Sequence, residues 1–263
     1  MTRMDVSFFI ASIMVGFLAQ IIDGALGMAY GITSSSFLLS LGVPPSIASA
    51  SIHISEIFTS GTSGLSHVRS GNVDGPLAKS LLIPGVIGGI LGAYVLTSLP
   101  AELVKPIVAV YMLVMGCMIL RRTFLRVKHA KVKTYLAPLG FVGGLCDAIG
   151  GGGWGPIVTS TLVARGQNPR FAVGSVNLTE FFVTVAESGA FLYLLGIPDP
   201  HLIVGLIIGG VIAAPIAAHV CKRIPAQALM IAVGIVIILL SIQMLLSSHR
   251  SFIAPDLLLM HLT

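Results

Sequence analysis

Five acidic side chains lie inside long apolar stretches of the sequence. They are half of the ten Asp and Glu residues of the chain: Asp23, Glu56, Asp147, Glu180 and Glu187. A charged group inside a bilayer costs several kcal/mol unless it is protonated, paired or facing water, so such residues are candidates for binding ions or protons. Burial favours the neutral form, and entry of water releases the proton. We therefore predict that Glu56 and Glu180 bind and release protons, with burial as neutral, hydrogen-bonded carboxyl groups as the alternative.

Two glycine-rich segments begin at acidic residues, Asp23-Gly-Ala-Leu-Gly-Met-Ala-Tyr-Gly and Asp147-Ala-Ile-Gly-Gly-Gly-Gly-Trp-Gly. Glycine lets backbone N–H groups approach a ligand, and the helices expected to restart near Ile32 and Pro156 would point their positive dipole ends at it. Two such ends can hold an anion without a full positive charge. The candidate binding residues in these segments are Asp23, Gly24, Gly27, Met28, Tyr30, Asp147, Gly151, Gly152, Gly153 and Trp154. The alternatives remain open: the glycines only permit a tight turn, and the two Asp residues only accept N–H groups freed where a helix breaks.

Two further polar residues lie on the same helical faces as the glutamates. His53 precedes Glu56 by three residues, and Asn177 precedes Glu180 by three. Both are predicted to contact the ligand, and His53 could also relay a proton. The alternative for His53 is a buried histidine with satisfied hydrogen bonds. Tyr30 and Trp154 are expected either to wall the site or simply to pack at the helix breaks.

The composition places these residues in a membrane protein. The 263 residues are 55% hydrophobic and only 10% charged, against roughly 25% charged residues in soluble domains. This excludes a soluble enzyme, a disordered chain and a nucleic-acid-binding protein, and favours an all-α polytopic membrane protein. Its three cysteines lie apart in apolar stretches, which indicates neither a disulfide framework nor a metal site. Neither a dinucleotide-binding fingerprint nor a phosphate-binding loop is found, so no cofactor is expected.

Apolar segments of helix length follow one another along the chain, and the glycine-rich segments interrupt the first of each half. The expected helices are 6–22, 32–41, 46–65, 76–99, 101–120, 135–149, 156–164, 170–195, 201–221 and 226–246. A basic segment, 121–134, lies between two apolar halves and is predicted to be a cytoplasmic loop under the positive-inside rule. Residues 249–263 are too short to span and are expected at the interface.

The two halves are copies of one another. A shift of 124 aligns thirteen identical residues within the 43 positions from Gly16 to Phe58. They are Gly16, Phe17, Asp23, Gly27, Gly31, Ser36, Leu38, Gly42, Pro45, Ala48, Ser51, Glu56 and Phe58. We therefore predict an N-terminal repeat over 1–120 and a C-terminal repeat over 135–248, joined by the linker 121–134 and followed by the tail 249–263. Each repeat has a glycine-broken first segment, as a hairpin or a broken helix, and three transmembrane helices. Repeated halves are typical of secondary transporters.

Loop charges favour an inverted relationship between the halves. If each half crosses the membrane four times, the Lys and Arg residues divide ten inside and five outside. If each glycine-broken segment goes in and comes back, they divide twelve to three. The positive-inside rule favours the second arrangement, with both termini outside.

The repeated glycine-rich segments, the small-residue helix with an acid after each, and the basic central loop resemble the sulfite exporter TauE/SafE family, also called the 4-toluene sulfonate uptake permease family. The resemblance covers nearly the whole chain. It implies a bacterial inner-membrane secondary transporter of sulfite, sulfonates or related organosulfur anions such as sulfoacetate. From the acidic residues at membrane depth we further predict that transport is coupled to protons and works by alternating access. Trp154 and Pro156 depart from the small or aliphatic residues of many members, which bears on the shape of the binding site.

Two other functions are compatible with parts of the sequence. A passive anion channel could use the same fold. An intramembrane serine protease could use Ser63 of the Gly61-Thr-Ser-Gly string with His201 or His219, although this leaves the duplication unexplained. The expected partners are a small anion, protons and the lipid bilayer, with no nucleic acid, and a homodimer is left open.

Overall fold

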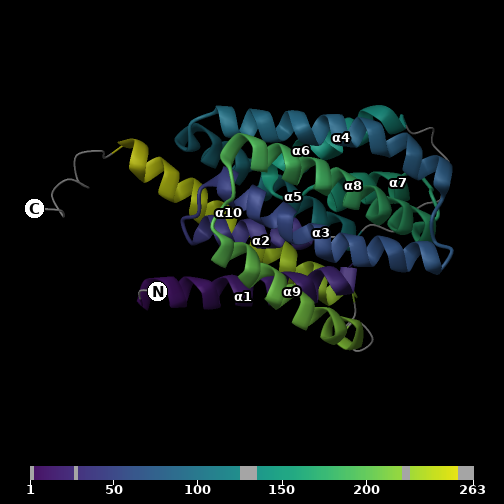
Figure 1. Ribbon diagram of the computed structural model, residues 1–263, viewed down its shortest axis with the longest axis horizontal. Helices are drawn as coiled ribbons and strands as arrows, with labels where there is room; N and C mark the ends of the chain where they lie inside the picture. The colour runs from purple at the N-terminus through teal and green to yellow at the C-terminus, as the bar shows by residue number, and fades with distance from the viewer. Residues whose placement is uncertain (1–2, 27–28, 125–134, 221–225, 254–263) are drawn as a thin grey trace, which may run out of the picture.

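The computed structural model describes residues 3–26, 29–124, 135–220 and 226–253, and these ranges consist of helices joined by short loops, with no β-strand in them. Figure 1 shows the helices as a bundle whose main direction follows the long axis of the molecule. The helices are α1 (Arg3–Leu26), α2 (Tyr30–Ser40), α3 (Pro45–Arg69), α4 (Gly75–Ser98), α5 (Ala101–Phe124), α6 (Leu136–Gly150), α7 (Ser160–Ala164), α8 (Pro169–Leu195), α9 (Pro200–Val220) and α10 (Ala226–Ile253), and a π-helical turn, Gly155–Thr159, leads into α7.

Four of the described helices are long and apolar enough to cross a membrane. Their apolar windows are Val6–Asp23, Gly75–Ser98, Ala101–Arg121 and Arg170–Leu195. A bilayer core needs about 20 apolar residues in a helix. Together with the all-helical architecture, these spans confirm the predicted polytopic membrane fold.

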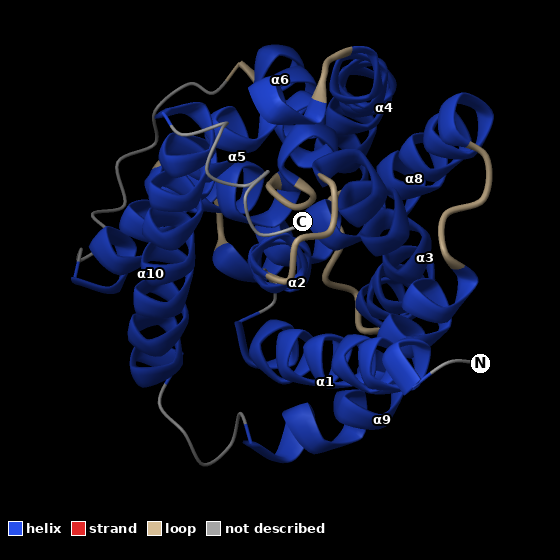
Figure 2. Cartoon of the chain, turned by 90° about the vertical axis from the view of Figure 1, so that its left-hand side faces the viewer, coloured by secondary structure: helices blue, strands red, loops and turns tan. Residues whose placement is uncertain are grey.

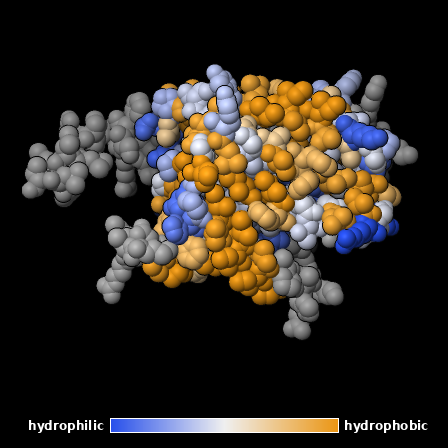
Figure 3. Space-filling model, viewed as in Figure 1, coloured by the Kyte–Doolittle hydropathy of each residue, from blue (hydrophilic) through white to orange (hydrophobic). Residues whose placement is uncertain are grey.

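The bundle exposes apolar side chains on its outside and buries polar side chains together with its apolar core. Large hydrophobic side chains such as Ile83 and Ile87 of α4 are exposed one helical turn apart, and Figure 3 shows apolar residues spread over much of one face. The buried polar side chains gather on α2, α3 and α8 and include Ser34, Glu56 and Glu187. Exposed apolar side chains suit lipid, so the hydrophilic residues of the chain can concentrate at its centre.

Helix pairs from the two halves pack in matching ways. Helix α1 packs on α9, and α6 packs on α4. Gly16 of α1 lies against the backbone of Leu206, and Gly140 of α6 lies against the backbone of Leu81. Gly16 and Gly140 are equivalent under the shift of 124. Leu81 and Leu206 are equivalent under a shift of 125, which aligns the later part of the repeats, including Gly85 with Gly210. Glycine permits these close approaches because it has no side chain to separate the helices.

Helices α3 and α8, which occupy equivalent places in the two repeats, cross at the centre in opposite directions. His53, early in α3, contacts Glu187 late in α8, whereas Ser63 late in α3 contacts Asn177 early in α8. Equivalent helices that run antiparallel support the inverted arrangement of the halves. Their orientation relative to the membrane stays a prediction.

Some helix ends differ from those expected from the sequence. Helix α1 continues through Asp23 to Leu26, and α10 extends to Ile253, into the segment expected to be a separate tail. Helix α5 likewise runs to Phe124, into the expected linker. The remaining linker residues 125–134 and tail residues 254–263 lie outside the described parts of the chain.

Candidate functional site

A polar cavity lies where the two helix breaks meet α3 and α8, and we call it the central cavity. Its volume is about 20 Å³, which is room for about one or two water molecules. It is lined by Asp23, Ala29, Tyr30, Gly31, Ile32, Glu56, Thr59, Ser60, Ser63, Asp147, Gly152, Gly153, Gly155, Pro156, Asn177 and Glu180. Five pairs in this set are equivalent under the shift of 124, with Asp23–Asp147 and Glu56–Glu180 among them. Both repeats therefore contribute the same positions to one cavity.

The second break is organised by Asp147. Helix α6 ends at Gly150, and Gly151 follows in the left-handed conformation with φ of 64°. The Oδ1 atom of Asp147 then accepts the backbone N–H groups of Gly153 at 2.5 Å and Trp154 at 2.9 Å. Its backbone oxygen accepts the N–H group of Gly152 at 3.0 Å. The side chain thus accepts hydrogen bonds from N–H groups that the broken helix leaves free. This is the structural role that the sequence analysis gave as the alternative for Asp147.

The first break has a weaker form of the same arrangement. The Oδ1 atom of Asp23 accepts the N–H group of Tyr30 at 3.3 Å. Thr33 donates to Ala29 as the first intrahelical bond of α2. The N–H groups of Gly31 and Ile32, in the first turn of α2, therefore have no intrahelical acceptor, and both residues line the central cavity.

The two aromatic residues pack at the breaks. Trp154 is fully buried, and its indole Nε1 donates to the backbone oxygen of Val176 at 3.1 Å. Tyr30 donates its hydroxyl group to the backbone oxygen of Leu206 at 3.4 Å. Tyr30 lines the central cavity, whereas the indole of Trp154 packs against Gly85 of α4 behind it.

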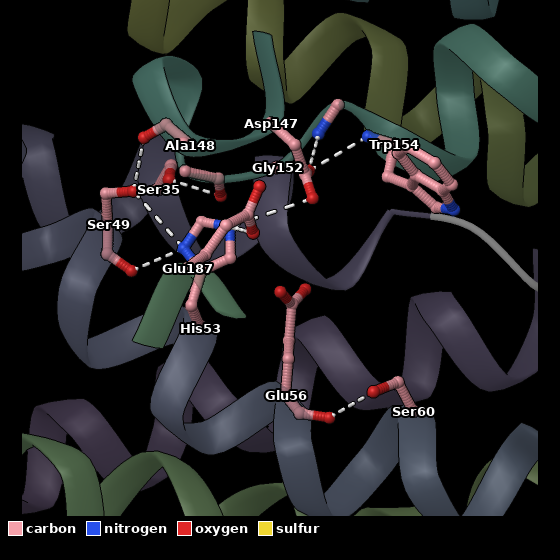
Figure 4. A network of polar contacts seen from close by, with 12 residues as sticks. Ser35, Ser49, His53, Glu56, Ser60, Asp147, Ala148, Gly152, Trp154 and Glu187 are labelled. Carbon is pink, nitrogen blue, oxygen red and sulfur yellow. Dashed lines mark hydrogen bonds and ion pairs between the residues drawn. The ribbon is translucent and has the colours of Figure 1, made fainter. Parts of the chain in front are cut away.

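His53 faces away from the central cavity and into a buried cluster. Its Nε2 atom lies 2.9 Å from Oε2 of Glu187 and 3.7 Å from Oδ2 of Asp147. Figure 4 shows the imidazole between Ser49 and Glu187, and the carboxyl group of Glu56 on the side of the helix break. The structure therefore gives His53 and Glu56 different partners, although the sequence places them on one helical face.

Most of the predicted site residues come together, and several lining residues were missed. Thr59, Ser60 and Ser63 lie on the same side of α3 as Glu56, so helical spacing from Glu56 could have found them. Gly151 forms the cap of α6, and Gly24 lies in the last turn of α1. Gly27 and Met28 lie outside the described residues.

These features define the class of protein. It is a multi-pass helical membrane protein whose polar residues line a small central cavity. The family profile described as "Sulfite exporter TauE/SafE" matches residues 12–244. The chain belongs to this family, as the resemblance predicted.

A named relative supports the same assignment. The chain is 42% identical over 243 residues to the "Probable membrane transporter protein YtnM" of Bacillus subtilis (strain 168), covering 89% of this chain and 81% of the relative. No solved structure matches. Family and relative together identify the chain as a multi-pass bacterial membrane transporter of the TauE/SafE type, which gives no support to the protease alternative.

Proposed function

We propose that this chain carries a small sulfur-containing anion, such as sulfite or a sulfonate, across the bacterial inner membrane by alternating access coupled to protons. The observation that carries the proposal is the central cavity, to which both glycine-rich breaks and both glutamates contribute equivalent positions. Substrate sites of secondary transporters commonly lie between repeats, at discontinuous helices.

Backbone N–H groups are the proposed anion ligands. Gly31 and Ile32 lie in the first turn of α2 and line the cavity, and the helix dipole would add to the attraction of their N–H groups for an anion. Asp147 already occupies the N–H groups of Gly153 and Trp154. An anion would therefore bind beside Asp147, or would displace its carboxyl group from these donors.

Four carboxyl groups around an anion site require protons. Asp23, Glu56, Asp147 and Glu180 all line the cavity, and an ionised carboxylate beside a bound anion is repulsive at short range. Protonation of Glu56 and Glu180 would remove two of these charges as the anion enters. This links anion binding to proton binding, which is the proposed basis of coupling.

The cavity is too narrow for the proposed substrates in the described conformation. A volume that holds one or two waters does not admit a sulfonate group with its carbon chain. Binding therefore requires the helices around the cavity to separate. Antiparallel α3 and α8, which border it from opposite repeats, are the elements proposed to move between outward-open and inward-open states.

Binding and transport can be tested on the purified chain. A thermal-stability screen with sulfite, thiosulfate, sulfoacetate, taurine and aromatic sulfonates should identify a stabilising anion, because a ligand that binds only the folded state raises its stability. The hit should then accumulate in proteoliposomes against its gradient when a pH gradient is imposed. Uptake that only equilibrates would make the chain a passive channel, and the absence of any stabilising anion would contradict the substrate class.

A further inference from the structure

His53 has one ring nitrogen fixed as a donor. Its Nδ1 atom lies 2.7 Å from the backbone oxygen of Ser49, one turn earlier in α3. A carbonyl oxygen only accepts hydrogen bonds, so Nδ1 carries a hydrogen. The Ser49 hydroxyl group, 3.2 Å from Nδ1, donates its own hydrogen to the backbone oxygen of Ala148 at 2.6 Å. It can therefore only accept from the ring.

The other ring nitrogen faces a carboxyl group at hydrogen-bond distance. Nε2 lies 2.9 Å from Oε2 of Glu187, and both side chains are 0% exposed. Without a hydrogen between them, the lone pair of Nε2 would face a carboxylate oxygen where no water can separate the two. The contact therefore requires one proton, held either as an imidazolium facing a carboxylate or as an imidazole facing a carboxylic acid.

The equivalent contact in the other repeat holds no titratable group. The shift of 124 maps His53 onto Asn177 and Ser63 onto Glu187. Ser63 donates its hydroxyl group to Oδ1 of Asn177 at 3.0 Å. Both crossings of α3 and α8 thus contain a polar side-chain contact, but only the contact between His53 and Glu187 can gain or lose a proton. A neutral pair is enough to hold α3 and α8 together at the equivalent contact. Helix association alone therefore does not explain why His53 and Glu187 are titratable residues.

Asp147 connects this pair to the central cavity. Its Oδ2 atom lies 3.7 Å from Nε2 of His53, while its Oδ1 atom holds the N–H groups of Gly153 and Trp154. Within the described residues, His53 is the one basic side chain that contacts these buried carboxyl groups. A change of charge at His53 and Glu187 therefore acts directly on the residue that shapes the second helix break.

The other titratable groups facing this cluster are mostly acidic and come from several helices. They are Asp147 and Cys146 of α6, Glu56 of α3, Glu180 of α8 and Tyr111 of α5. We propose that His53 and Glu187 bind a proton between them, and that Asp147 transmits the occupancy of this site to the helix break at the central cavity. This inference rests on the proposed function, because the cavity whose shape it controls is the proposed anion site.

The fluorescence of Trp154 can report on the proposed connection between the His53–Glu187 pair, Asp147 and the second helix break. Trp154 is the one tryptophan of the chain, it is fully buried, and its backbone N–H group donates to Asp147. Its fluorescence in the detergent-purified full chain should change between about pH 5 and 8, the range in which histidines commonly change charge. The change should be absent in Glu187→Gln. It should also be absent in the double variant His53→Asn with Glu187→Ser, which copies the neutral pair of the other repeat.

The control variant is His201→Asn. His201 is exposed and contacts Asp199 at the start of α9, so this variant should keep the wild-type pH response. An unchanged response in Glu187→Gln and the double variant would overturn the proposal, as would a wild type that does not respond. Glu187→Gln is nearly isosteric and serves alone if the double variant fails to fold.

Two further measurements separate the remaining outcomes. Sulfoacetate added at fixed pH tests the proposed function: no binding, with the pH response intact, would contradict the substrate and leave the proton site supported. The spacing of His53, Asp147 and Glu187 would also admit a metal ion. A stoichiometric metal in the purified chain, with a fluorescence response removed by a chelator, would overturn the proton site.

Discussion

The indole ring of Trp154 lies directly against Gly85 of α4, so closely that a methyl group at position 85 would lie 2.5 Å from Cη2 of the ring. The equivalent position in the other repeat, Gly210, has room for a methyl group: a Cβ there would lie in ordinary van der Waals contact, 3.6 Å from its nearest neighbours, among them the hydroxyl group of Tyr30. The larger ring of Trp154 thus fills the space beside its glycine, whereas Tyr30 leaves room.

This difference predicts unequal effects of the same substitution. Gly85→Ala should lower the free energy of unfolding by about 1–3 kcal/mol, the usual cost of overpacking a buried site. Gly210→Ala is the matched control and should change it by less than about 0.5 kcal/mol. Thermal or denaturant unfolding of the detergent-purified variants measures both. Equal losses in the two variants would show that Trp154 can move aside.

The two aspartates at the helix breaks should differ in their contribution to stability. Asp147 is buried and accepts two backbone N–H groups, whereas Asp23 is half-buried and accepts that of Tyr30 at a longer distance. Since a hydrogen bond to a charged group contributes about 1.5–3 kcal/mol, Asp147→Ala should destabilise the fold by about 3 kcal/mol or more. Asp23→Ala should cost less than half of that. Unfolding curves of both variants test the order, and the reverse order would contradict the geometry.

Glu56 and Glu180 are predicted to take part in proton coupling. Glu→Gln mimics the protonated side chain and removes its titration. Each single variant should therefore still exchange substrate between equal compartments but lose the response to an imposed pH gradient. Exchange and gradient-driven uptake in proteoliposomes measure the two properties. A wild-type response to the pH gradient in both variants would mean that the coupling site lies elsewhere, and His53 and Glu187 would be the next candidates.

The inverted arrangement predicts the sidedness of two loops. Single cysteines introduced at Asp199 and Lys222, in a chain whose native cysteines have been replaced, should react with a membrane-impermeant thiol reagent from opposite sides. Asp199 should react from outside and Lys222 from inside. The opposite pattern would restore the arrangement with four full crossings in each half.

The sequence alone determined the class of protein and predicted the two helix breaks that border the central cavity. Hydropathy and helix length are local properties, so they predicted an apolar helical bundle without any knowledge of packing. Repeated residues such as Asp23 and Asp147 identified the two helix breaks, because a duplicated sequence adopts the same local structure twice. The cavity lies where these breaks were predicted to meet.

Only the tertiary structure decided which side chains face each other. His53 and Glu56 share a helix, and sequence spacing joined them. Packing of α8 against α3 instead turns His53 toward Glu187 and leaves Glu56 at the cavity. The N–H groups of Gly152 and Gly153, expected to be free for a ligand, are taken by Asp147. Such contacts depend on how the helices cross and on how the broken turn folds back. The residue periodicity within a single segment predicts neither of these.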